Sequence, residues 1–99
     1  MESSTDNQEQ SMIEIIKASE LNSIYFNEFG IGVSKNDILI LLRRNGKPEA
    51  VLNASHITAK SLVNSLDEAI RRFEDKTNQK IPTSSEIEKL IEEEDERNV

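Results

Sequence analysis

The sequence contains no cysteine, which excludes disulfide bonds, zinc fingers and thiol nucleophiles and fits a reducing compartment. No apolar run approaches the roughly 20 residues that a membrane-spanning helix needs. The first ten residues, MESSTDNQEQ, contain no basic region and no apolar core, so we do not expect a signal peptide. These absences predict a cytoplasmic protein that has no membrane partner.

The frames around which many enzymes are built are also missing. Gly30 and Gly32 lack the third glycine and the following helix of a phosphate-binding loop. His56 is the only histidine, and the sequence contains no nucleophile motif such as G-x-S-x-G for which it could act as the general base. The acidic run at residues 92–96 lacks the alternating spacing of a calcium loop. We therefore expect no enzyme, no catalytic residue, no cofactor and no metal site.

The formal net charge of −7 is concentrated at the two ends of the chain. Residues 1–20 carry −4 and residues 81–99 carry −5, whereas residues 21–80 carry +2. An acidic protein repels nucleic acid and anionic lipid, because its own field opposes their approach. The charge therefore argues against a DNA-associated regulator, which is the least favoured function for this sequence.

A chain of 99 residues is expected to form one domain with one small core. Polarity predicts a flexible acidic arm over residues 1–11, an α+β domain over 12–81, and a short helix with an acidic tail over 82–99. The β-branched residues of Met12–Ala18 favour a short strand there. The competing interpretation of that segment is a helical turn.

Three further strands follow in the sequence. Alternating residues predict a strand over Ser23–Ser34, and the apolar run Asp37–Arg44 predicts a second strand that is covered on both faces. Asn45-Gly46 is the strongest short hairpin signal available and predicts a two-residue type I′ turn into a third strand. The sequence leaves the order of the strands in the sheet open.

The two-residue turn fixes the register of the hairpin and sorts its side chains onto two faces. One face carries Leu39, Leu41, Ala50 and Leu52. The other face carries the residues that we predict to form an oligomer interface: Ile38, Ile40, Leu42 and Val51.

A long amphipathic helix follows, with Ser55 as its N-cap and an end near Thr77. A capping box of Thr83 and Glu86 opens a second, shorter helix. The long helix carries an apolar stripe with spacings of three and four, made of Ala59, Leu62, Val63, Leu66, Ala69, Ile70 and Phe73.

These elements predict an α+β fold in which one long amphipathic helix packs on one face of an antiparallel three- or four-stranded sheet, followed by a short C-terminal helix. The second face of the sheet is left over, and monomers rarely expose large apolar patches. We therefore predict a non-enzymatic homo-oligomeric interaction module, adaptor-like or chaperone-like, that binds itself and another protein.

The alternative function is the binding or sequestering of a small anionic ligand. Arg43, Arg44 and Lys47 cluster at the hairpin tip and could hold a phosphate or an acidic peptide, although such charges also serve to solvate a turn. Tyr25 and Asn27 are the polar residues of the first long strand that we would test for ligand contact, against a purely structural role.

Several short patterns resemble a small family of uncharacterised bacterial, archaeal and phage proteins, a numbered domain of unknown function. The resemblance covers about residues 12–81, departs at His56, where the family often has proline, and implies a fold more than an activity. The order of strands and then helices is also similar to that of SecB-like chaperones. The matching residues are Ile13-Glu14-Ile15, Tyr25-Phe26-Asn27, Ser34, Asp37, Ala59-Lys60, Leu62, Leu66, Ile70 and Phe73-Glu74.

Overall fold

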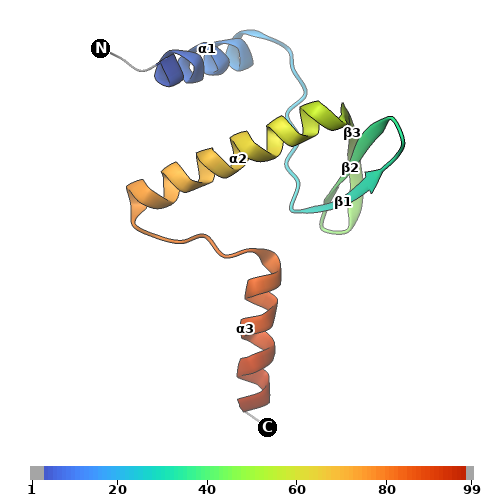
Figure 1. The fold of residues 1–99 in the computed structure, drawn as a ribbon, viewed down its shortest axis with the longest axis vertical. Coiled ribbons are helices and arrows are strands. Elements are labelled where there is room, and N and C mark those ends of the chain that lie inside the picture. The colour runs from blue at the N-terminus through green and yellow to red at the C-terminus, as the bar shows by residue number, and fades with distance from the viewer. Residues whose placement is uncertain (1–3, 98–99) are drawn as a thin grey trace. The chain divides into compact units, whose positions relative to one another are not determined.

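The computed structural model describes residues 4–97 and has the predicted α+β composition, with a three-stranded antiparallel sheet, a long helix and a shorter C-terminal helix (Figure 1). In those residues no helix is both long and apolar enough to cross a membrane. The elements in chain order are α1 (Ser4–Ala18), β1 (Glu28–Val33), β2 (Asp37–Arg44), β3 (Lys47–Ser55), α2 (His56–Thr77) and α3 (Ser84–Arg97).

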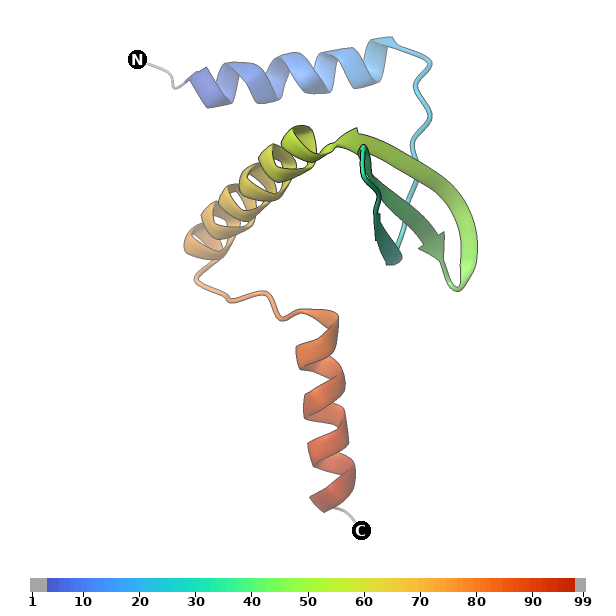
Figure 2. The same ribbon diagram turned by 45° about the vertical axis from the view of Figure 1, so that its right-hand side comes forward.

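The chain divides into two units, Met1–Asn53 and Ala54–Val99, which we describe separately. The strands lie in the first unit up to the last residues of β3, and β3 continues directly into α2 (Figure 2). The packing of α2 on the sheet and the domain limits at residues 12 and 81 stay predictions.

Helix α1 corrects the interpretation of the N-terminal segment. Met12–Ala18, for which we favoured a strand, lies in α1, and so do residues 4–11, which we expected to form a flexible arm. The spacing of Met12, Ile15 and Ile16 by three and four explains this result, because it places the three side chains on one helical stripe. The helix ends where the Ser19 amide donates a hydrogen bond of 3.1 Å to the Ile15 carbonyl.

Strand β1 is shorter than the sequence pattern suggested, because residues 20–26 are irregular. A tight turn joins β1 to β2. There the Ser34 amide donates to the Asp37 carbonyl at 2.9 Å, and the Ser34 hydroxyl accepts from the Asp37 amide at 3.0 Å. Ser34 therefore closes the β1–β2 hairpin with both its backbone and its side chain.

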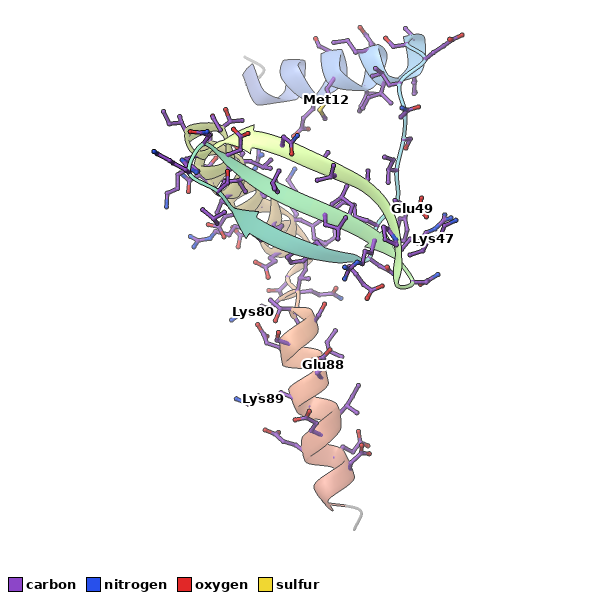
Figure 3. All side chains as sticks on the ribbon, turned by 90° about the vertical axis from the view of Figure 1, so that its right-hand side faces the viewer. Met12, Lys47, Glu49, Lys80, Glu88 and Lys89 are labelled. Carbon is purple, nitrogen blue, oxygen red and sulfur yellow. The ribbon has the colours of Figure 1, made fainter. Side chains whose placement is uncertain are left out.

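The sheet has the order β1-β2-β3, so β2 is the central strand (Figure 3). The register of β1 with β2 pairs Phe29 with Leu42, Ile31 with Ile40, and Val33 with Ile38. Residues that pair directly share a face of the sheet. We call this face, with Val51 added by the β2–β3 turn, the Ile40 face: Phe29, Ile31, Val33, Ile38, Ile40, Leu42 and Val51.

Very little of this apolar surface is buried in the described part of the chain. Leu42, at 4% exposure, is the one hydrophobic side chain there that counts as buried. Ile38 and Ile40 are half-buried, whereas Phe29, Ile31 and Val33 are exposed. The sheet therefore presents an open apolar face with one buried residue, Leu42, near the hairpin end of the central strand.

Helix α2 begins and ends as its capping residues dictate. The Ser55 side chain accepts a hydrogen bond of 3.1 Å from the Thr58 amide, which confirms the predicted N-cap. At the other end Asn78 adopts the left-handed conformation (φ 52°, ψ 39°), and the amides of Asn78 and Gln79 both donate to the Glu74 carbonyl. None of the residues of α2 is buried, so its apolar stripe is open.

Helix α3 opens with the predicted cap, because the Glu86 amide donates to the Thr83 hydroxyl at 3.2 Å. It continues to Arg97, so the acidic residues 92–96, which we expected in a tail, lie in the helix. Residues 98–99 lie outside the described part of the chain.

Candidate functional site: the hairpin tip

Four of the five polar residues that we predicted as ligand contacts, Asn27, Arg43, Arg44 and Lys47, lie at the tip of the β2–β3 hairpin. The turn itself is confirmed as type I′, since Asn45 (φ 52°) and Gly46 (φ 82°) both have positive φ. Asn27 lies beside this turn, because its backbone amide donates to the Arg43 carbonyl at 3.1 Å. A residue that is distant in sequence therefore reaches the turn.

Asn27 holds the turn with its side chain. Its Nδ2 donates to Asn45 Oδ1 at 2.9 Å, and its Oδ1 accepts from the Asn45 backbone amide at 3.0 Å. Both hydrogen-bonding atoms of the amide group are thus engaged in the fold. A structural role for Asn27 accounts for both contacts.

Glu28 contacts the backbone of the turn with its carboxylate. Its Oε1 accepts a hydrogen bond from the Gly46 backbone amide. Successive amides in a turn can form an anion-binding concavity, but here the Asn45 amide is taken by Asn27 and the Gly46 amide by the Glu28 carboxylate. Side chains of the same chain therefore accept the hydrogen bonds of both turn amides.

The basic residues of the tip are balanced by neighbouring acids. Arg44 Nε lies 3.5 Å from Glu49 Oε1, and the two side chains are 54% and 26% exposed. Figure 3 shows Lys47 and Glu49 next to each other at this end of the sheet. With Glu28 also at the tip, three cations, Arg43, Arg44 and Lys47, share this end of the sheet with two carboxylates, which weakens the field that an anionic ligand would meet.

The other single candidates are exposed. Tyr25, at 70% exposure, precedes β1 on the irregular segment. His56 is the first residue of α2 and is also exposed. Among residues 9–95, whose side chains the structure describes, no group of three or more histidines and acids could hold a metal ion.

The predicted interface residues lie together on the Ile40 face, but they differ in accessibility. Val51 is 56% exposed and Ile40 is half-buried. Leu42 is buried, so it adds almost no accessible area to this face. Phe29, Ile31 and Val33 belong to the same face and are at least as exposed as Val51, although the sequence pattern did not place them in the interface.

Two residues of the tip were also missed, namely Glu28 and the accepting side chain of Asn45. A signal for them exists, because counting back across the turn after β1 brings Asn27 and Glu28 opposite the end of β2, next to Asn45-Gly46. That count requires the exact position of the first turn.

In comparisons with known proteins, no family model, no curated protein and no solved structure matches the chain. The family resemblance noted from the sequence therefore stays a prediction, and the function must be inferred from the geometry.

Proposed function

We propose that this chain is a non-enzymatic, homo-oligomeric protein-interaction module of the cytoplasm, adaptor-like or chaperone-like, whose contact surface is the Ile40 face. The observation that carries the proposal is the exposure of that face. Phe29 is 65% exposed, Ile31 and Val51 are each 56% exposed, and Val33 is 73% exposed. The absence of cysteine supports the reducing compartment.

An open face of this kind needs a cover. Monomeric proteins rarely expose contiguous apolar patches larger than a few hundred Å2, and larger patches mark interaction sites. Fully burying one Val, Ile or Phe side chain contributes about 1.5–3 kcal/mol. Four side chains that are more than half exposed therefore offer a large stabilisation to any protein surface that covers them.

The opposite face of the sheet is apolar as well. The opposite side of the sheet carries Leu39, Leu41 and Leu52, of which Leu39 and Leu52 are 40% and 46% exposed. Both faces of the sheet are thus apolar, so a cover on one of them leaves the other open. A second copy or another protein is left to cover the remaining face.

The polar groups of the hairpin tip are bonded within the chain, which favours binding through the apolar face over binding through the tip. The Gly46 amide donates to the Glu28 carboxylate, and the Asn27 side chain is bonded to Asn45, so neither group is open to an anion. These contacts speak against the alternative, a small anionic ligand held by Tyr25, Asn27, Arg43, Arg44 and Lys47.

Native mass spectrometry of the gently purified chain tests the proposal. We expect a mass of two or more whole multiples of 11.2 kDa, with no added mass. A multiple that carries a few hundred additional daltons would favour the ligand alternative, and a monomer at micromolar concentration would overturn the proposal.

The interaction with other proteins has its own assay. Light scattering from a reduced, aggregating model protein should fall when the wild-type oligomer is added. It should fall less with Val33→Ser, which makes the most exposed member of the Ile40 face polar. Equal protection by Val33→Ser and the wild type would argue against this face as the contact surface.

A further inference from the structure

The outer edge of β1 carries unpaired backbone groups whose positions follow from the register. The Ser34 amide donates to the Asp37 carbonyl at 2.9 Å, and this pair continues the register of Val33 with Ile38. Hydrogen-bonded and non-hydrogen-bonded pairs alternate in an antiparallel ladder. Because Ser34 with Asp37 is a hydrogen-bonded pair, Val33 with Ile38 is a non-hydrogen-bonded pair and Gly32 with Leu39 is hydrogen-bonded again. The N–H and C=O groups of Gly32 and, two residues earlier, of Gly30 therefore point toward β2.

It follows that the N–H and C=O groups of Phe29, Ile31 and Val33 point away from β2, and β2 is the one neighbour of β1 in the described sheet. These are the same residues whose side chains are 65%, 56% and 73% exposed on the Ile40 face. The strand thus presents free hydrogen-bonding groups and free apolar side chains at the same positions.

The two edges of the sheet differ in how they are protected against pairing. Natural edge strands carry charges, proline or bulges that discourage pairing with another strand. Strand β3 has Lys47, Pro48 and Glu49 at its start, and Pro48 has no N–H to offer. Strand β1 has no charged residue and no proline from Phe29 to Val33. Its edge is open along that whole stretch.

The two glycines of β1 are not required by this chain. A Cβ atom added at Gly30 would lie 4.0 Å from the Leu41 Cβ, and one added at Gly32 would lie 3.7 Å from the Leu39 Cβ, which are ordinary contacts. Neither glycine has positive φ. They do give the segment Phe-Gly-Ile-Gly-Val a pattern that is symmetric about Ile31.

We propose that β1 pairs edge to edge with β1 of a second copy, antiparallel and centred on Ile31, so that two sheets join into one continuous six-stranded sheet. A two-fold interface is self-complementary, and the symmetric pattern meets that condition. Ile31 then lies opposite Ile31 of the second copy. Phe29 lies opposite Val33 of the second copy, and Gly30 lies opposite Gly32 of the second copy. All three outward N–H groups of each chain find carbonyl acceptors.

This pairing rests on the proposed function, because it specifies how the homo-oligomer forms. It also extends that function, since joining the sheets places two Ile40 faces side by side and doubles the apolar surface offered to another protein. An association of the two Ile40 faces against each other is the competing arrangement.

Matched variants separate these arrangements. Ile31 and Val51 lie on the same face with the same exposure of 56%, but Val51 is on β3. Ile31→Lys sets two like charges opposite each other at the two-fold axis, and we expect it to raise the dissociation constant by about 100-fold or more. Val51→Lys should leave the association unchanged. Sedimentation equilibrium measures both, and circular dichroism checks that each variant is folded.

Amide hydrogen exchange of the unaltered chain provides a test that needs no variant. We expect slow exchange at Phe29, Ile31 and Val33 and fast exchange at Ala50 and Leu52, whose amides point outward from β3 in the register of the two-residue turn. An oligomer in which the β1 amides exchange fast, or in which both lysine variants dissociate, would overturn edge pairing and leave the proposed function standing. A monomeric wild type would overturn both.

Discussion

Replacing Asn27 by alanine should destabilise the first unit by about 1–2 kcal/mol, because it removes two hydrogen bonds that hold the β2–β3 turn. These are the bonds of 2.9 Å to Asn45 Oδ1 and of 3.0 Å from the Asn45 amide. One net hydrogen bond contributes about 0.5–1.5 kcal/mol. Both bonds are exposed, so water replaces the lost partners and no further penalty for an unsatisfied group applies.

Urea unfolding followed by circular dichroism measures this effect. With a slope of about 1–2 kcal/mol per molar urea, typical of the smaller proteins, the midpoint should fall by roughly 1 M. All variants are compared at one protein concentration, because the stability of an oligomer depends on concentration.

Two controls make the test specific. Asn27→Asp keeps an oxygen that accepts from the Asn45 amide but loses the Nδ2 donor, so it should cost about half as much. Asn36→Ala changes an exposed asparagine in the other turn of the sheet and should stay within about 0.5 kcal/mol of the wild type. If Asn27→Ala were as stable as Asn36→Ala, a structural role for Asn27 would be refuted, and a ligand role would regain support.

Four other predictions follow from single features of the structure. Gly46→Ala should cost about 1–2 kcal/mol in urea unfolding, because φ of 82° disfavours a residue with a Cβ atom. Ser55→Ala should cost about 1 kcal/mol in the same assay by removing the N-cap of α2, and an unchanged midpoint would contradict that assignment. Asn78→Gly should raise the thermal midpoint slightly, since glycine adopts the left-handed conformation more readily, whereas a fall would show that the asparagine side chain matters. Inorganic phosphate should not shift the thermal midpoint of either the wild type or the Arg43→Ala/Arg44→Ala variant, and a shift seen in the wild type alone would restore the anion site.

The sequence by itself determined the features whose energetics are local. Asn45-Gly46 made a type I′ turn because both residues tolerate positive φ. Ser55 began α2 because its side chain satisfies an amide that a helix leaves unpaired at its start. Hydrophobic spacing placed α2 and β2 correctly for the same reason, since the period of a pattern reports the local backbone.

The tertiary structure decided what depends on residues distant in sequence. Met12–Ala18 is a different case, because its local sequence fits both a strand-like and a helix-like pattern, and the structure has a helix there. The extent of β1 was set by its pairing with β2, which ends at Glu28, so the apolar alternation that continues before it formed no strand.

The role of Asn27 shows the same limit at the candidate site. As an isolated polar residue beside Tyr25 it suggested a ligand contact. Only the register across the β1–β2 turn brings it to Asn45 and places Glu28 on the Gly46 amide. That register also decides which backbone groups of β1 point outward. A one-residue shift would reverse every one of these assignments, because the side chains and hydrogen-bonding groups of a strand alternate with a period of two.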